Sequence, residues 1–283
     1  MKEKLKILET PRDGFQGIAK FIPTERKVEF INLLLQCGFD TVEVGSLVSP
    51  KAIPQMADSI EVLNKLDYSR TKSRIAILVA NKNGGKKAID FEVIDDLIFP
   101  FSVSETFLKK NINQGFEEAE LTIDFLQNLC VASNKRLIPY LSMGFGNPYG
   151  DDWDLEVLYK WTEKFVAKGI KTIPVSDIMG EADAKRIFNV FNSLINEFPD
   201  IEFGLHLHSR KETAKEKIDA AWQAGIRRFD TVMGGLGGCP MTGKELIGNL
   251  PLGILLDYSE ENKIETGLDK ECLERAMSFN VLV

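Results

Sequence analysis

The chain contains only two histidines, His206 and His208, near the end of the apolar run Ile201-Glu-Phe-Gly-Leu-His-Leu-His208. In an extended strand, residues i and i+2 point to the same side, so both imidazoles would project from one face. Two nitrogen ligands on one face suit a divalent metal ion. A pair of structural histidines is the alternative, because so short a motif often occurs by chance.

Short apolar runs alternate with longer amphipathic runs along the chain, which indicates alternating strands and helices. Several helical patterns are closed by a glycine, as at Gly38, Gly169 and Gly225. The predicted strands are Leu5–Glu9, Thr41–Gly45, Arg74–Val79, Val93–Phe99, Arg136–Ser142, Thr172–Ser176, Glu202–His208 and Phe229–Met233. The clearest predicted helices are Thr24–Cys37, Gly115–Ser133, Asp154–Lys168, Glu181–Glu197 and Glu212–Ala224.

Eight strand-helix units of this length predict parallel strands, right-handed crossovers and a closed barrel. The predicted fold class is therefore α/β, a (β/α)8 TIM barrel with additional C-terminal helices. The 283 residues are close to the size of one such barrel. Since no linker rich in Pro, Ser or Gly divides the chain, we expect residues 1–283 to form a single catalytic domain.

Polar residues stand where several predicted strands end, which is where barrels of this kind build their sites. Arg12 and Asp13 follow the first strand, Glu43 lies in the second, and Asp177 follows the sixth. The glycine-rich segment 234–240 follows the eighth strand. Barrel interiors are normally apolar, so inward-facing carboxylates and imidazoles need partners, and a metal ion would supply one.

Composition limits the classes of partner. The net charge of −7 argues against a nucleic-acid surface, and no apolar stretch reaches the roughly 18 residues of a membrane span. The first residues lack the apolar core of a signal peptide. The four cysteines lack C-x-x-C spacing, which favours reduced thiols. We expect a cytoplasmic protein that binds neither nucleic acid nor membrane.

A set of motifs spread over nearly the whole chain resembles one known family. The motifs are Thr10-Pro-Arg-Asp-Gly-Phe-Gln16, Val42-Glu-Val-Gly-Ser-Leu-Val-Ser-Pro-Lys51, Ser104-Glu-Thr-Phe-Leu-Lys-Lys-Asn-Ile-Asn113, His206-Leu-His208, Gly235-Leu-Gly-Gly-Cys-Pro240 and Gly248-Asn249. Together they resemble the 3-hydroxy-3-methylglutaryl-CoA lyase family, a branch of the metal-dependent lyase and synthase barrels (DRE-TIM type).

The resemblance implies a set of metal ligands: Asp13, His206, His208 and Asn249. Two oxygens and two imidazole nitrogens leave positions open for water or substrate. A mixed donor set without thiolate suits Mg²⁺ or Mn²⁺, with Zn²⁺ as an alternative.

The resemblance also implies a retro-Claisen cleavage of a hydroxyacyl-CoA to a keto acid and acetyl-CoA. Metal binding would lower the pKa of the substrate hydroxyl, so that a base can remove its proton. Arg12 would face the developing negative charge. Cys239, on a glycine-rich loop that could close over the substrate, would donate a proton to the enolate or act in the acid-base relay.

Further roles follow from the same resemblance. Glu43 would brace Arg12 or a metal-bound water, while Asp177 and His206 would act in acid-base catalysis. A buried ion pair without catalytic function would explain either carboxylate equally well. The residues implied in substrate contact are Gln16, Ser46, Lys51, Lys109 and Lys110, the last two on a loop that approaches the acyl-CoA. Lys109 and Lys110 could equally be an ordinary solvated basic pair.

Three segments depart from the family pattern. Ser209-Arg-Lys-Glu212 stands where the family continues with Asp-Thr, Ile178 stands where threonine is usual, and Leu250-Pro-Leu-Gly253 stands where a Thr-Glu pair is expected. Because groups behind the ligands orient them and tune the metal, these changes concern specificity more than fold.

Other functions stay open at this level. A related barrel aldolase acting on a free 2-oxo or hydroxy acid, or a condensing synthase running in the opposite direction, would use similar residues. A barrel that binds a metal and an acyl-CoA without turnover is a third alternative. The sequence does not decide the oligomeric state, and a homodimer is one option.

Overall fold

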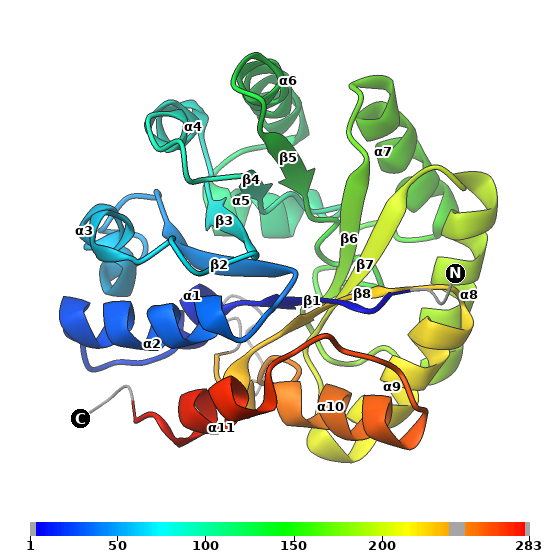
Figure 1. Ribbon diagram of the computed structural model, residues 1–283. Coiled ribbons are helices and arrows are strands. Elements are labelled where there is room, and N and C mark those ends of the chain that lie inside the picture. Colours follow the sequence, from blue (N-terminus) through cyan, green and yellow to red (C-terminus); the bar gives the residue numbers. More distant parts are fainter. Residues whose placement is uncertain (1–3, 238–246, 281–283) are drawn as a thin grey trace.

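The computed structural model describes residues 4–237 and 247–280, and its centre is a sheet of eight parallel strands. The strands are β1 Lys6–Glu9, β2 Thr41–Ser46, β3 Arg74–Leu78, β4 Asp96–Phe99, β5 Arg136–Pro139, β6 Thr172–Asp177, β7 Glu202–Leu207 and β8 Arg228–Thr231. Their order is β5-β4-β3-β2-β1-β8-β7-β6. The two outer strands meet through a parallel bridge between Leu141 and Val175, so the sheet closes into a barrel (Figure 1).

The eight predicted strands are confirmed, and three of them differ by more than one residue at an end. Val93 belongs to a turn, so β4 starts later than its apolar lead-in predicted. β5 ends at Pro139, because beyond it only isolated bridges form, from Leu141 to Val175 of β6 and from Ser142 to Ser102. Met233 leaves β8 and starts a 3-10 turn, η2 Met233–Gly235, in which Gly234 has φ 79°. A positive φ is tolerated by glycine and ends the extended run there.

The predicted helices are confirmed to within a few residues. They are α2 Thr24–Gln36, α6 Phe116–Ala132, α7 Leu155–Ala167, α8 Ala184–Glu197 and α9 Lys211–Gln223. Shorter elements complete the units: α1 Pro11–Gln16, η1 Pro54–Met56, α3 Ser59–Lys65, α4 Lys82–Ile89 and α5 Glu105–Ile112. The expected C-terminal helices are α10 Leu252–Glu261 and α11 Lys270–Ser278.

Two helices lie outside those predicted from the sequence. The segment Pro11 to Gly14 forms most of α1, because proline at the first helical position has a suitable φ and needs no N–H partner. Lys109 and Lys110 lie in α5 instead of on a loop. Ser104 caps that helix by accepting a hydrogen bond from the Phe107 amide.

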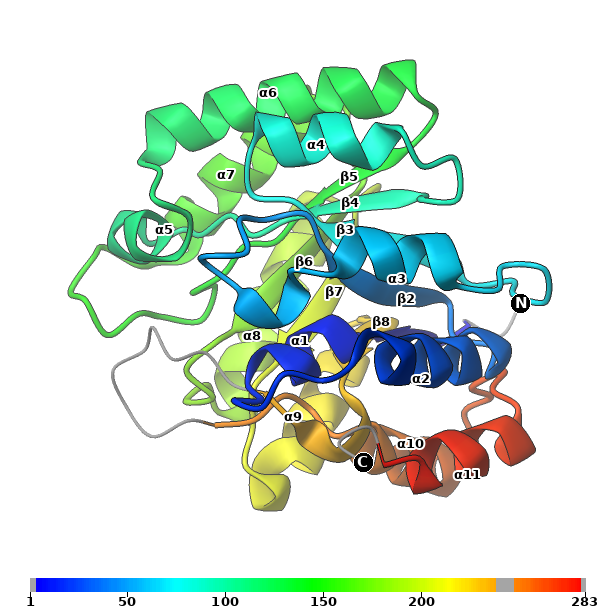
Figure 2. The same cartoon turned by 90° about the vertical axis from the view of Figure 1, so that its left-hand side faces the viewer.

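The helices surround the barrel as an outer layer. α4 packs beside α6, and α11 packs on α2 (Figure 2). α10 packs against α9, so the last two helices cover the barrel near β8 and β1. One apolar core lies between the strands and this helical layer. A second, smaller cluster fills the barrel itself and includes Leu8, Ile98 and Tyr140.

Charged groups line the amino-terminal end of the strands. Asp96 binds Arg74 and Arg136 through their guanidinium groups, and Lys6 is paired with Glu202. This end is therefore occupied by side chains that bind one another. None of the helices in the described residues has the length and apolarity needed to cross a bilayer.

Candidate metal centre and active site

A cavity of about 430 Å³ opens at the carboxyl ends of the strands. Most of the residues singled out from the sequence line it: Arg12, Asp13, Gln16, Glu43, Lys110, His206 and His208. They come from α1, β2, α5, β7 and the residue that follows β7. The barrel thus brings together residues nearly 200 positions apart, at the end where such folds bear their sites.

Three predicted ligands converge in this cavity. One ligand atom from each of Asp13, His206 and His208 lies within 4.8 Å of the others. The Nδ1 atom of His208 lies 3.0 Å from the carbonyl oxygen of Ile247, which fixes the proton on that nitrogen. The Nε2 atom of His206 lies 3.8 Å from a carboxylate oxygen of Asp13. The Nε2 nitrogens and the carboxylate are thus the atoms available to a cation.

Asn249, the fourth predicted ligand, is buried beside this group. It forms a bridge with His208, and its side chain hydrogen-bonds to Asp13. Its Nδ2 donates to the carbonyl of Leu236 at 3.0 Å. Gly237 packs tightly here: a Cβ atom on it would lie 2.6 Å from Asn249 Nδ2 and 2.9 Å from the Asp13 carbonyl. The glycine-rich motif therefore allows close approach of backbone to the ligand group.

The charge states of the ligands suit a cation. Burial and the charge of His206 lower the pKa of His208 to about 4, so its imidazole is neutral at physiological pH. Burial by itself raises the pKa of Asp13. Arg12 and the two histidines lower it by more, so the pKa of Asp13 lies below its usual value. A donor set of one carboxylate, two imidazole nitrogens and the side-chain oxygen of Asn249 fits Mg²⁺ or Mn²⁺ and also Zn²⁺.

Arg12 connects the ligand group to a second carboxylate. It donates to both carboxylate oxygens of Glu43, to Asp13 at 3.0 Å and to Gln16 at 3.2 Å. Burial raises the pKa of Glu43 to about 7, although the guanidinium of Arg12 opposes this shift. A preorganised guanidinium in a buried cavity is well placed to stabilise an oxyanion.

Asp177 is not among the residues that line the cavity. Its two carboxylate oxygens accept hydrogen bonds from the amides of Gly180 and Ala182, each at 2.9 Å. Burial raises its pKa. Along β6 the side chains alternate, so Ser176 faces the cavity and Asp177 the turn before α8. For an acid-base role, the Asp177 carboxylate would have to break its hydrogen bonds to these two backbone amides.

The predicted substrate contacts divide into two groups. Gln16 and Lys110 line the cavity, and the Lys110 ammonium lies 4.3 Å above the ring of Tyr149. Lys109 is not part of the cavity lining and is paired with Glu105 at 3.0 Å. Ser46 is buried outside the cavity wall, and Lys51 is exposed. Cys239 lies outside the described residues.

The sequence reading missed two buried residues behind the ligands. Tyr140 follows β5 and lines the cavity, and its hydroxyl donates to Asp230 of β8 at 2.7 Å. The other neighbour of this Asp230 oxygen is His206 Nδ1, at 3.2 Å. The available signal was an acidic residue, Asp230, next to Phe229 in a predicted barrel strand, because a buried carboxylate needs partners.

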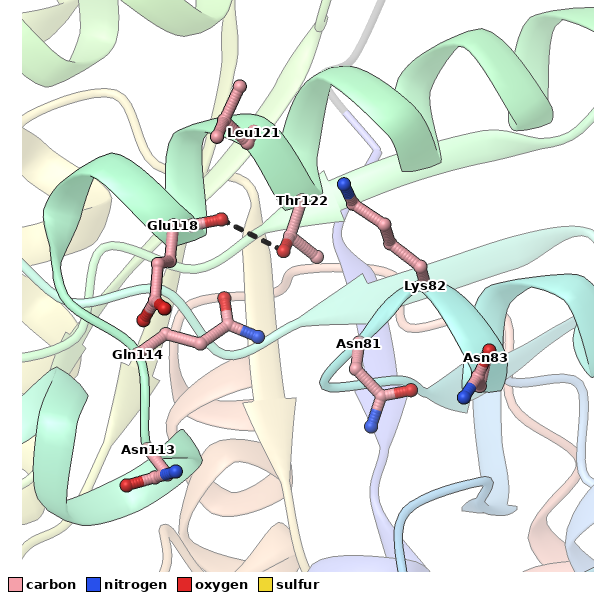
Figure 3. A pocket seen from close by; sticks show the side chains of 8 residues that line it. All are labelled: Asn81, Lys82, Asn83, Asn113, Gln114, Glu118, Leu121 and Thr122. Atoms are coloured by element: carbon pink, nitrogen blue, oxygen red, sulfur yellow. Dashed lines mark hydrogen bonds between the residues drawn. The ribbon is translucent and has the colours of Figure 1, made fainter.

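A second pocket adjoins the cavity and shares Asn81 and Asn113 with it. Figure 3 shows its polar side chains projecting from the start of α4 on one side, and from the end of α5 and the start of α6 on the other. A hydrogen bond from Thr122 to the carbonyl of Glu118 holds part of the α6 wall. The cavity thus continues toward the molecular surface between these helices.

Comparison with known proteins places this site in a family. The HMGL-like family model matches residues 4–279. The chain belongs to the HMGL-like family. It is 34% identical to hydroxymethylglutaryl-CoA lyase YngG of Bacillus subtilis, over 98% of this chain and 92% of that protein. The family resemblance and the barrel predicted from the sequence are both confirmed.

Solved structures agree with this membership. The crystal structure of the B. subtilis HMG-CoA lyase aligns with a TM-score of 0.90 and 33% identity, over 97% of this chain and 92% of that one. An HMG-CoA lyase from Acinetobacter baumannii in complex with coenzyme A and 3-methylmalate aligns with a TM-score of 0.89 and 26% identity. That alignment covers 97% of this chain and 89% of the other.

The segments that depart from the family pattern have local partners. Ser209 donates its hydroxyl to the carbonyl of Arg210, just before α9 begins at Lys211. Leu250 and Leu252 are fully buried, and Pro251 is the N-cap residue of α10. In this HMGL-like chain, apolar packing occupies the segment where the family has a polar pair.

Proposed function

We propose that the protein is a metal-dependent carbon-carbon lyase that cleaves 3-hydroxy-3-methylglutaryl-CoA to acetyl-CoA and acetoacetate. The observation that carries the proposal is the convergence of Asp13, His206 and His208 with Arg12 in one cavity. The HMG-CoA lyases to which the chain is similar support the substrate. Residues 1–283 would act as one catalytic domain.

The proposed reaction is a retro-Claisen cleavage. The substrate's tertiary hydroxyl loses its proton, the bond between C2 and C3 breaks, and C3 becomes the ketone of acetoacetate. The bonding electrons pass to C2 as the thioester enolate, which takes up a proton to give acetyl-CoA. A divalent cation held by Asp13, His206, His208 and Asn249 would lower the pKa of the hydroxyl.

The chain's own residues would orient and stabilise this process. Arg12 has its guanidinium fixed by Glu43, Asp13 and Gln16, so it can stabilise developing negative charge without reorganising. Cys239, on the segment after η2, is proposed as the proton donor to the enolate. For Asp177 we keep the proposal of an acid-base role, which needs a rearrangement of its turn.

The acyl-CoA would enter between α4, α5 and α6. Lys110 lies in the cavity wall, and the adjoining pocket with Asn81 and Asn113 extends toward solvent. The path from the metal-ligand residues to the surface passes Lys110. It fits an extended substrate whose distal part carries negative charge. The structure with coenzyme A and 3-methylmalate supports this class of ligand. A cytoplasmic location and a homodimer remain predictions.

The deciding experiment is a turnover assay on metal-depleted protein given Mg²⁺, Mn²⁺ or Zn²⁺. We expect acetyl-CoA and acetoacetate from 3-hydroxy-3-methylglutaryl-CoA, detected by mass spectrometry. Cleavage of free hydroxy acids instead would favour the aldolase alternative, and formation of a hydroxyacyl-CoA from acetyl-CoA would favour the synthase. Binding of acyl-CoA without turnover under any metal would reject the lyase.

A further inference from the structure

Asp230 lies directly behind one of the metal-ligand candidates. The strand register pairs it with Leu8 of β1 and with His206 of β7, and Leu8 belongs to the apolar cluster inside the barrel. One of its oxygens, Oδ2, accepts a hydrogen bond from the Tyr140 hydroxyl at 2.7 Å and lies 3.2 Å from His206 Nδ1. His206 is thus held between Asp230 on one side and Asp13 on the other.

The charge of Asp230 has a counterpart two residues earlier. Arg228 and Asp230 occupy alternate positions of β8, so both side chains face the barrel interior. Within the described residues, Arg228 Nε and Nη2 and Asp230 Oδ1 are buried without a hydrogen-bond partner. Arg228 Nη1 lies 3.8 Å from a carboxylate oxygen of Asp40, and its positive charge also attracts the Asp230 carboxylate. A positive charge inside the barrel therefore offsets part of the cost of burying Asp230.

An imidazole can bind a metal ion only through a nitrogen that carries no proton. Which nitrogen that is depends on the hydrogen bond made by the other one. In His206 the Nδ1 atom faces a carboxylate oxygen, which accepts and does not donate. This arrangement fixes the proton on Nδ1 and leaves Nε2, the atom that faces Asp13, with a free lone pair.

We propose that Asp230, held by Tyr140 and balanced in charge by Arg228, is a positioning residue that sets the tautomer and ring orientation of His206. The inference rests on the proposed metal centre. It assigns a role to three barrel-interior residues, each in a place where an apolar side chain would fill the same space. Loss of such a partner typically weakens metal binding about 10- to 100-fold.

The test reads the His206 tautomer by ¹⁵N NMR of histidine-labelled protein at alkaline pH, without substrate, in the metal-free and Mg²⁺-loaded forms. Only two imidazoles contribute signals, because the chain has two histidines. We expect the proton of His206 on Nδ1 in the wild type. In Asp230→Ala the proton should shift toward Nε2, and the Mg²⁺ affinity measured by calorimetry should fall about 10- to 100-fold.

The matched control is Glu9→Gln, which removes another buried carboxylate, on the neighbouring strand β1. Glu9 accepts from Thr231 and Met233 and does not contact His206, so its variant should keep the wild-type tautomer. Tyr140→Phe should also keep that tautomer but bind Mg²⁺ more weakly than the wild type. If Asp230→Ala does not fold, the His206 tautomer of the wild type and the Mg²⁺ affinity of Tyr140→Phe still test the proposal.

Two results would overturn the proposal: a wild-type His206 protonated on Nε2, or Asp230→Ala with unchanged tautomer and unchanged Mg²⁺ affinity. Both are independent of turnover. A protein with the expected tautomer that cleaves no acyl-CoA would contradict only the proposed function. An active lyase with the wrong tautomer would contradict only this inference.

Discussion

Arg12 and Glu43 are joined by two parallel hydrogen bonds. Arg12 Nε donates to Glu43 Oε1 at 2.9 Å, and Nη2 donates to Oε2 at 2.8 Å. Such a planar pair fixes the guanidinium in one orientation, which a lysine ammonium cannot reproduce. The remaining Nη1 nitrogen reaches Asp13, so the pair also links the arginine to the metal ligands.

Arg12→Lys should lower kcat by about 10² or more while changing KM much less, because the interaction serves the transition state. Steady-state kinetics on 3-hydroxy-3-methylglutaryl-CoA measures both parameters. Circular dichroism and the melting temperature must confirm that the variant folds. A turnover number equal to that of the wild type would remove Arg12 from the mechanism.

His208→Ala should abolish tight binding of Mn²⁺, because it removes one of the two imidazole ligands from the group around Asp13. Calorimetric titration measures the affinity. In the wild type, a chelator should abolish turnover, and Mg²⁺ or Mn²⁺ should restore it. Full activity after exhaustive chelation would show that turnover does not need a metal bound at these residues.

The neighbouring lysines of α5 offer a matched pair. Lys110→Met should raise KM for the acyl-CoA about tenfold, the equivalent of roughly 1.4 kcal/mol of binding, because the side chain lines the cavity. Lys109→Met should leave KM unchanged, since Lys109 is 59% exposed and paired with Glu105. Equal effects of the two substitutions would argue against this path for the acyl-CoA.

Cys239→Ser should keep the fold and the metal affinity but lose most cleavage activity, because a hydroxyl is a much weaker acid than a thiol. Substrate analogues should protect Cys239 from alkylation, as measured by peptide mass spectrometry. Cys37 and Cys130 serve as internal controls: burial raises the pKa of each thiol to about 12, so they should stay unlabelled. Near-normal activity of the serine variant would identify Cys239 as a bystander.

Glu9 should make the stability pH-dependent. Burial raises its pKa from 4.5 to about 8, although hydrogen bonds from Thr231 and Met233 oppose the shift. Because the folded pKa is the higher one, the stabilisation is complete below pH 4.5 and is lost as the pH rises through 8. The loss is on the order of 5 kcal/mol in the free energy of unfolding.

Urea unfolding of Glu9→Gln at several pH values measures this contribution. The variant should lack the loss seen in the wild type between mildly acidic and alkaline pH. Glu117→Gln, which changes an exposed glutamate, should behave like the wild type. An unaltered pH profile in Glu9→Gln would mean that another group carries the dependence.

The sequence by itself determined the barrel and part of its site. Apolar runs alternating with amphipathic ones predict eight strand-helix units, because each pattern has one favourable way to bury its apolar side. The spacing of His206 and His208 predicts two imidazoles on one face, because strand geometry repeats every two residues. Motif resemblance added Asp13 and Asn249 to the same metal site.

The tertiary structure decided which polar residues reach the cavity. Ser176 and Asp177 are neighbours at the end of one strand, yet only the serine lines the cavity wall, while the aspartate binds backbone amides. Tyr140 and Asp230 are 90 residues apart, and only barrel closure brings them together. Local patterns fix the period of each element, but the register between strands sets which side chains face inward.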